Sequence, residues 1–362
     1  MQISIAHPIF QTIIFAVVLG VVFLCTLRRK KGTELFPLET TNELKGFAIL
    51  AILLGHIAYS LFQHQTFLFP LSVFAGMGVD LFLFLSGFGL ACSALKTQLS
   101  RKEFYEKRLG KIFFSLWIVL FLFFVIDFFA LDKTYPLREI ISSFFGFFPR
   151  ADLTQNINSP LWYITFILFY YLIFPWVFNK NHPVFSSVGL YILTWLLLQL
   201  TLPLNPSVKH LYELHAFAFP LGVAFSAFLP RISPFLFEKK SPIISLLVIC
   251  ATVLLLYFGI HSGVGKEVWL EQGISLLLVF FILVIFILKQ FEFRFLSLLG
   301  TYSHEIYLLH WPIMSRYDFL YTVLPAGVAT LLYVGIFLCL GFSFSWILKK
   351  FARQSKIKQN TP

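Results

Sequence analysis

Long apolar segments fill most of this chain, and they constrain its fold more than any other feature. Each is long enough to cross roughly 30 Å of hydrocarbon as a helix. They lie at residues 8–27, 45–63, 72–95, 112–131, 159–178, 185–203, 210–230, 241–260, 271–288, 296–314 and 323–348. Charged residues make up 12% of the sequence, roughly half the share typical of a soluble domain. We therefore predict an all-α integral membrane protein, a bundle of about eleven transmembrane helices.

Positive charge is distributed unevenly between the two sides that these segments define. Of the 28 Lys and Arg residues, 22 fall on one side, with dense runs at 28–31 and 349–358. Loops rich in Lys and Arg stay in the cytoplasm. We therefore predict a multi-pass protein of the cell membrane with its N-terminus outside and its C-terminus cytoplasmic. The same distribution explains the net charge of +11 without a nucleic-acid partner.

Three regions follow from this pattern. Residues 1–40 form an amino-terminal transmembrane helix and a basic linker, residues 41–348 the main transmembrane domain, and residues 349–362 a basic cytoplasmic tail. The first helix is expected to be retained, because no Lys or Arg precedes it and the positive cluster follows it, unlike a secretory signal. We expect the cysteines to be unpaired packing residues, since they lie in apolar runs: Cys25, Cys92, Cys250 and Cys339.

Lys45 and His56 lie eleven residues apart within one apolar stretch. Eleven helical residues rotate about 1100°, so the two side chains share a face to within about 20° and are about 16 Å apart along the axis. Ionisable groups inside a membrane segment are costly and point to a functional site. We predict that Lys45 holds a phosphate and that His56 is a general base. A structural histidine hydrogen-bonded between helices is the competing interpretation.

Asp80 is expected at a depth similar to that of His56, because each lies seven or eight residues from the outer end of its segment. A carboxylate beside an imidazole fixes its tautomer and stabilises the imidazolium. We therefore predict that Asp80 orients His56 as a second catalytic residue. A buried structural Asp–His pair would need the same geometry.

Polar residues also mark the segment at 299–312. Ser303, Tyr307 and His310 fall at i, i+4 and i+7 and form one stripe. Glu305 and His304 point elsewhere, and the spacing of a His-Glu-x-x-His zinc site is absent. We predict that Ser303, Tyr307, His310 and Glu305 line a cavity or acceptor site, and we expect no metal.

A basic cluster and a tryptophan complete the candidate site. Lys107, Arg108 and Lys111 lie near the predicted cytoplasmic mouth, where they could neutralise a phosphate-rich donor; they could also serve topology alone. Trp162 opens the segment at 159–178. It is either a tryptophan of the membrane interface or a surface on which a sugar ring stacks.

Five segments, in order along residues 44–314, resemble the motifs of the acyltransferase 3 family of membrane O-acyltransferases. They are Lys45 to His56, Gly78 to Phe88, Lys107 to Ile112, Pro160 to Trp162, and Leu299 to His310. Three features depart from the family pattern, one of them the pair His304-Glu305, where small or aromatic residues are commoner. Lys45 stands where Arg is commoner, which keeps the charge but loses bidentate geometry. The segment at 8–27 would be a helix added before a ten-helix core.

The resemblance implies transfer of an acyl group, often acetyl, from cytoplasmic acyl-CoA to a hydroxyl of an extracytoplasmic or lipid-linked glycan or glycoside. It implies that His56 is catalytic and that Lys45 engages the donor. Acyl-CoA would be a substrate, and no tightly bound cofactor is expected. Without an esterase-like domain after the last segment, an envelope-biosynthesis partner could complete delivery. The alternative is a transporter or flippase with the same buried groups; it should show internal repeats, and we find none in the sequence.

Overall fold

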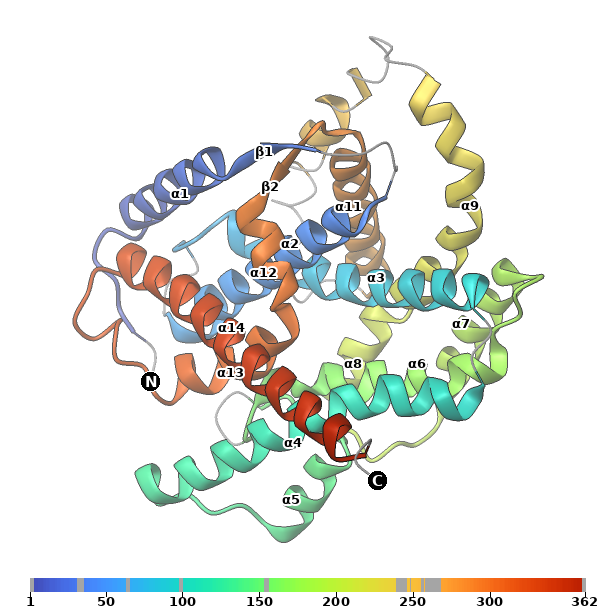
Figure 1. The fold of residues 1–362 in the computed structure, drawn as a ribbon. Helices are drawn as coiled ribbons and strands as arrows, with labels where there is room; N and C mark the ends of the chain where they lie inside the picture. The colour runs from blue at the N-terminus through green and yellow to red at the C-terminus, as the bar shows by residue number, and fades with distance from the viewer. Residues whose placement is uncertain are drawn as a thin grey trace.

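The computed structural model is almost entirely α-helical (Figure 1). It describes residues 3–30, 36–62, 66–97, 100–152, 156–238, 246–247, 249–254, 257 and 268–359. The first half contains α1 (Pro8–Cys25), α2 (Leu38–His56), α3 (Ala75–Lys96), α4 (Arg101–Leu131), α5 (Leu137–Phe144) and α6 (Trp162–Val177). The second half contains α7 (Pro183–Gln199), α8 (Pro206–His215), α9 (Ala218–Glu238), α11 (Val268–Leu288), α12 (Arg294–Thr301), α13 (Ser303–Ser315) and α14 (Ala326–Gln359).

Among the described residues, seven helical segments are long and apolar enough to cross a membrane. The predicted count of eleven is therefore not confirmed, although the all-α membrane class is. Two predicted spans fail these criteria for visible reasons, because α2 carries Glu39, Glu43 and Lys45 and α7 has only 17 residues. The predicted span 241–260 falls mostly outside the described residues.

Two predicted boundaries differ from the structure. The predicted span 112–131 begins earlier, at Arg101, in α4, one continuous helix of 31 residues that also carries Lys107, Arg108 and Lys111. Ser100 and Glu103 form a capping box that starts this helix, and no proline interrupts the apolar run that follows. The predicted span 296–314 is instead divided at Tyr302 into α12 and α13.

Helix α2 lies in the core of the bundle, packed between α12 and α3 (Figure 1). Glycines allow its backbone to approach α12 closely. A Cβ on Gly46 would overlap the carbonyl oxygen of Leu296, and a Cβ on Gly300 would overlap that of Asn42. Close approach through small residues is typical of membrane helices. This contact fixes the rotation of α2, the helix that carries Lys45 and His56.

Helices α3 and α9 approach each other in the same way. A Cβ on Gly87 would overlap the carbonyl oxygen of Phe219, and a Cβ on Gly222 would overlap that of Phe84. The four residues belong to segments more than 130 positions apart. Their contact holds α3 with one face toward α9 and another toward α2.

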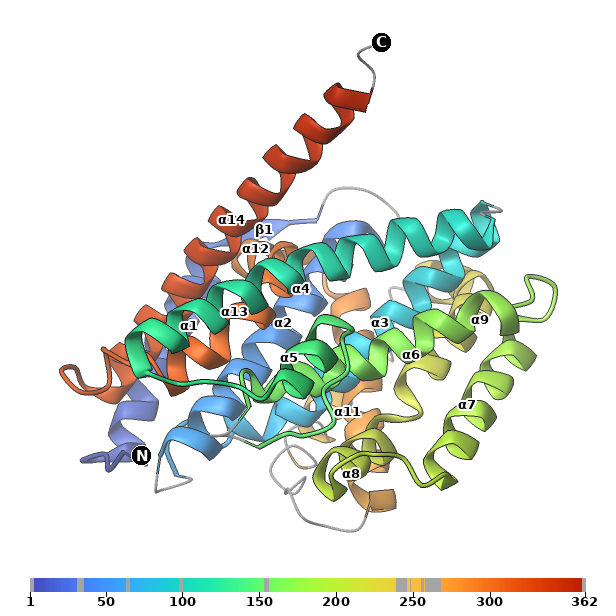
Figure 2. The ribbon, with the colours of Figure 1, turned by 90° about the horizontal axis from the view of Figure 1, so that it is seen from below.

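The amino-terminal helix α1 is attached to the bundle along α14. The side chain of Gln11 accepts a hydrogen bond from the backbone N–H of Gly327 at 3.1 Å. After α1, strand β1 (Leu27–Arg29) pairs antiparallel with β2 (Phe291–Phe293), with Leu27 opposite Phe293. The C-terminal part of α14 extends past the other helices (Figure 2).

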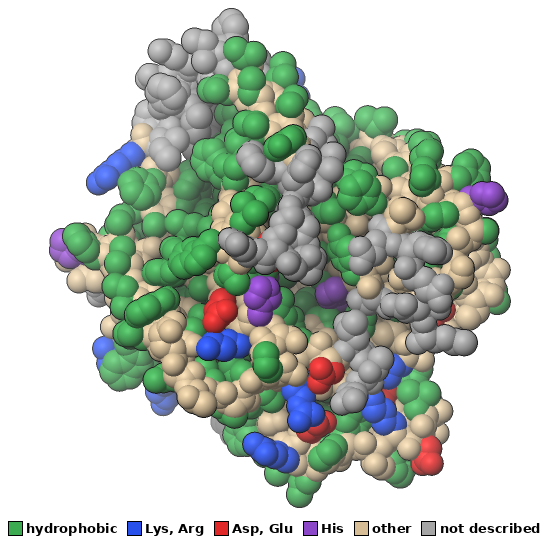
Figure 3. Space-filling view, turned by 180° about the vertical axis from the view of Figure 1, so that it is seen from behind, with side chains coloured by type: hydrophobic (Ala, Val, Ile, Leu, Met, Phe, Trp, Pro, Cys, Tyr) green, Lys and Arg blue, Asp and Glu red, His purple; other side chains and the backbone are tan. Residues whose placement is uncertain are grey.

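Much of the molecular surface is apolar. Phe121, Phe129, Phe185 and Trp195 are among many large side chains that face outward. Figure 3 shows hydrophobic side chains over much of one face, with the acidic side chains and most of the basic ones in its lower half. A soluble protein rarely exposes such continuous apolar area, whereas lipid tails cover it without cost. The structure is that of a multi-pass membrane protein.

Candidate active site

One cavity of about 670 Å³ lies between α2, α3, α4, α6 and α13; we call it the central cavity. It collects most of the side chains that the sequence singled out. The predicted site residues that line it are Lys45, His56, Lys107, Arg108, Lys111, Trp162, Ser303 and Tyr307. They come from segments spread over more than 260 positions.

The central cavity is basic toward one end and reaches an imidazole. Lys107 and Lys111 are exposed to solvent, whereas Lys45 and Arg108 are half-buried. His56, at the last residue of α2, is also only half-buried and lines the same cavity. The imidazole therefore lines the same cavity as the cations.

The hydrogen bonds of His310 define which nitrogen of His56 is free. His310 Nδ1 lies 2.8 Å from the carbonyl oxygen of Tyr307, and because a carbonyl only accepts, Nδ1 must be the donor. In neutral His310, Nε2 is then an acceptor. It lies 2.9 Å from His56 Nδ1, which must donate. His56 Nε2 is thereby left with its lone pair, the form a general base needs.

Packing around His56 restrains the ring further. Its plane lies parallel to that of His310 and meets Trp311 edge to face, with ring centroids 5.4 Å apart. Directly after His56 the chain widens into a π-helical turn, Ile57–Leu61. Such turns within helices occur frequently at functional sites.

Asp80 does not contact His56, so the predicted pairing of these two residues is wrong. One oxygen of the Asp80 carboxylate lies 2.7 Å from Nδ1 of His215, and the other accepts a hydrogen bond from Ser275. Asp80 is fully buried. Similar depth in the bilayer was the basis of the prediction, but depth does not fix the direction in which a side chain leaves its helix.

Asp80 nevertheless contacts the cavity wall through one intermediate. The ring of His215 stacks on Trp162, with centroids 5.7 Å apart and an angle of 15° between planes. Trp162 is 8% exposed, so it is a buried wall residue and not a tryptophan of the membrane interface. The chain from Asp80 through His215 holds the indole against the cavity.

Two predicted lining residues lie behind the wall of the central cavity. His310 is fully buried and does not line the cavity, although it contacts two residues that do, His56 and Tyr307. Glu305 is buried and forms a side-chain hydrogen bond with Ser345 of α14. Glu305 lies two residues after Ser303, about 200° further round α13, whereas His310 lies one turn beyond Tyr307, against His56.

Several lining residues were not predicted. Tyr163, Ile167 and Tyr171 recur every four positions on one face of α6, a periodicity that the sequence does carry. The Tyr171 hydroxyl lies 3.2 Å from that of Ser86. His304 also lines the cavity, with Nε2 at 2.8 Å from the Ser115 hydroxyl.

Within the described part of the chain, no group of three or more His, Cys, Asp or Glu side chains is arranged to hold a metal ion. The four cysteines are free thiols.

Comparison with known proteins gives a family match and two relatives. Residues 42–350 match a family described as an acyltransferase domain. The chain is 25% identical over 316 residues to the peptidoglycan O-acetyltransferase OatA of Listeria monocytogenes, covering 75% of this chain and 48% of that protein. It is 29% identical over 150 residues to the acyltransferase MdmB of Streptomyces mycarofaciens, covering 38% of each. The chain thus spans less than half the length of either relative. No solved structure matches it.

Proposed function

This chain belongs to the acyltransferase family, and from that premise we propose that it is a membrane enzyme that transfers acyl groups other than aminoacyl groups. The donor is cytoplasmic acyl-CoA, with acetyl as the acyl group. The acceptor is a hydroxyl of an extracytoplasmic or lipid-linked glycan. The enzyme lies in the cell membrane with its C-terminus in the cytoplasm, where an envelope-biosynthesis partner can act with it.

The single observation that supports this proposal most is the continuity of the central cavity. One cavity is lined both by a group of four cations and by His56. A phosphate-rich molecule with a reactive thioester at its far end matches that layout. A neutral solute in this cavity would leave the four cations without an anionic group to bind.

The donor's phosphates bind the cations of the cavity in this proposal. Lys107 and Lys111, which are exposed, meet the anion first, and Arg108 and Lys45 act closer to the interior. Charge-assisted hydrogen bonds to phosphate are about twice as strong as neutral ones. Partial exclusion of water strengthens them further.

His56 acts as the general base. Its Nε2 removes the proton from the acceptor hydroxyl while that oxygen attacks the thioester carbonyl. The C–O bond of the new ester forms, the C–S bond breaks, and the imidazolium returns its proton to the CoA thiolate. His310 positions His56 throughout the reaction. Nε2 of His310 accepts a hydrogen bond from Nδ1 of His56 at 2.9 Å, and this bond fixes the tautomer of His56. General-base catalysis of this kind typically contributes about 10²–10⁴ in rate.

The acceptor contacts the aromatic wall of the cavity. Trp162, Tyr163 and Tyr171 provide ring faces and hydroxyls of the kind that bind sugars, and Ser303 adds a polar group. A glycan is the acceptor class named for one relative, a peptidoglycan O-acetyltransferase. Asp80, through His215, holds the Trp162 ring in place.

The test is acyl transfer from labelled acetyl-CoA to cell-envelope glycans by the purified protein in detergent. The variant His56→Ala should lose transfer by at least about a hundredfold and keep the wild-type elution profile. His182→Ala, a matched change at an exposed histidine outside the cavity, should keep full activity. Full activity of His56→Ala would contradict the role of the base, and a wild-type protein that releases no CoA would contradict the donor.

A further inference from the structure

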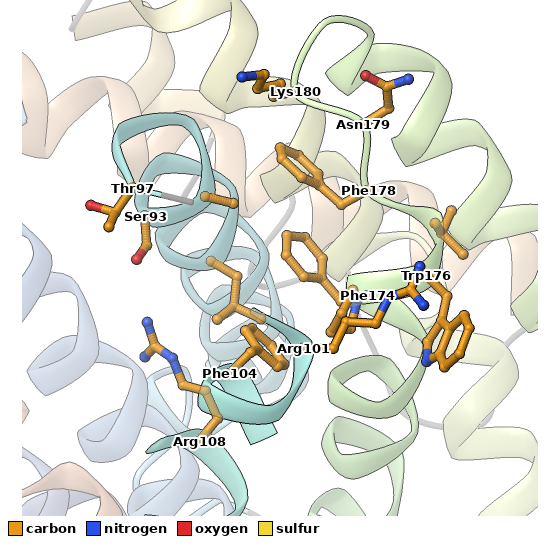
Figure 4. Close-up of a pocket in the computed structure, with 14 residues that line it drawn as sticks. Ser93, Thr97, Arg101, Phe104, Arg108, Phe174, Trp176, Phe178, Asn179 and Lys180 are labelled. Atoms are coloured by element: carbon orange, nitrogen blue, oxygen red, sulfur yellow. The ribbon is translucent and has the colours of Figure 1, made fainter. Parts of the chain in front are cut away.

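A second cavity, of about 610 Å³, adjoins the central cavity (Figure 4); we call it the side cavity. It lies between the end of α3, the start of α4 and the end of α6. The two cavities share four wall residues: Leu90, Ser93, Thr97 and Arg108. Nothing in the reaction at His56 requires this second space, so it needs its own explanation.

The charged groups of the side cavity favour an anionic ligand. Arg101, Arg108 and Lys180 line it, and none of its described lining residues is acidic. In Figure 4, Arg108 extends beside Ser93 and Thr97, whereas Arg101 lies on the other side of the phenylalanine rings, next to Trp176. Cations therefore stand at both ends of the rings, which suits a ligand with phosphates at more than one position.

The rings of the side cavity favour a ligand that also contains a flat aromatic group. Phe104 and Phe174 stack with centroids 5.9 Å apart, and Phe174 and Phe178 with centroids 4.8 Å apart, each pair within 20° of parallel. The guanidinium of Arg101 lies 3.8 Å from the centroid of the Trp176 ring. Phe104 and Phe174 are buried in this stack, so little of either ring is open to a ligand. Phe178 is half-buried and Trp176 is exposed, and these two offer ring surface on which a purine base packs.

We propose that the side cavity binds the nucleotide end of the acyl-CoA donor, its adenine and phosphorylated ribose. This inference rests on the donor proposed above. Arg108, in the wall shared by both cavities, then contacts the diphosphate where the donor turns from one cavity into the other. The pantetheine arm continues through the central cavity toward His56. The side cavity thus selects CoA over shorter thioesters.

Comparing KM for two donors distinguishes nucleotide binding in the side cavity from a general effect of a substitution on the enzyme. Acetyl-CoA carries the nucleotide, whereas acetyl-phosphopantetheine carries the same thioester and arm without it. For Arg101→Ala, KM for acetyl-CoA should rise about tenfold, the size of one lost charge-assisted contact, and KM for acetyl-phosphopantetheine should not change. Arg101 is exposed, so its removal should leave the fold intact.

The neighbouring residue offers a matched control. Lys102 has the same charge, its side chain is 86% exposed and lies within 3.9 Å of Glu106, and it does not line the side cavity. Lys102→Ala should therefore leave KM for both donors unchanged. Adenosine 3′,5′-bisphosphate, the nucleotide fragment alone, should inhibit the wild type competitively against acetyl-CoA and inhibit Arg101→Ala about tenfold less.

Equal KM changes for both donors, or none for either, would overturn the assignment. A lipid result would also overturn the assignment. If the purified wild type retained phosphatidylglycerol, Arg101→Ala did not, and KM were the same in both, the side cavity would hold a lipid headgroup. These outcomes differ from failure of the proposed function, in which the wild type would consume neither donor.

Discussion

Replacing His310 by phenylalanine should slow acyl transfer without unfolding the protein. His310 is fully buried and accepts the hydrogen bond from His56 Nδ1 at 2.9 Å. Phenylalanine fills a similar volume but accepts no hydrogen bond. His56 would lose the contact that fixes its tautomer and the orientation of its ring.

The size of the effect follows from that one bond. Leaving a buried donor unsatisfied costs about 1–3 kcal/mol. If that cost falls on the reactive orientation of His56, kcat should fall by roughly tenfold to a hundredfold, since each 1.4 kcal/mol is a factor of ten. KM for acyl-CoA should hardly change, because His310 does not line the central cavity.

Release of CoA thiol from acetyl-CoA, measured over a range of donor concentrations, separates kcat from KM. His310→Gln is the companion variant, since its amide oxygen can still accept from His56 and should restore part of the rate. Thermal unfolding of each variant in detergent reports whether the protein remains folded. A phenylalanine variant with the wild-type kcat would refute the positioning role.

Two further predictions concern the donor and the helix packing. Lys45→Ala should raise KM for acyl-CoA about tenfold, the effect of one lost contact to phosphate. Lys45→Arg keeps the charge, so its KM should stay near the wild-type value. Donor titrations that show the same KM for both variants would contradict the assignment. Gly87→Ala would drive a Cβ into the carbonyl oxygen of Phe219 and should lower stability by about 1–3 kcal/mol, whereas Gly335→Ala, where the added Cβ meets nothing within 4 Å, should not. Equal melting temperatures for the two glycine variants would show that α3 and α9 can separate freely.

Parts of the site that depend on a single helix could be predicted from the sequence. Lys45 and His56 share a face because an α-helix turns 100° per residue, and both line the central cavity. Ser303 and Tyr307, one turn apart, line it as well. In such cases, spacing along one element fixes the relative direction of two side chains.

Parts that depend on two helices could not be predicted in this way. The partner of Asp80 is His215, which lies 135 residues further along the chain. The close contact of Gly87 with Phe219 holds α3 against α9, and nothing in the sequence around one of these residues points to the other. The same limit explains why His310, placed by spacing on the cavity stripe, instead lies behind His56 as its hydrogen-bond partner.

The central claim is that a thioester entering at the basic end of the central cavity reaches His56. A structure of the protein with a non-hydrolysable acyl-CoA analogue tests it most directly. The account predicts that the phosphates lie beside Lys107, Arg108 and Lys111. It also predicts that the carbonyl carbon of the analogue lies near His56, with room between them for an acceptor hydroxyl about 3 Å from Nε2. An analogue bound outside the cavity, or one whose acyl end points away from His56, would contradict it.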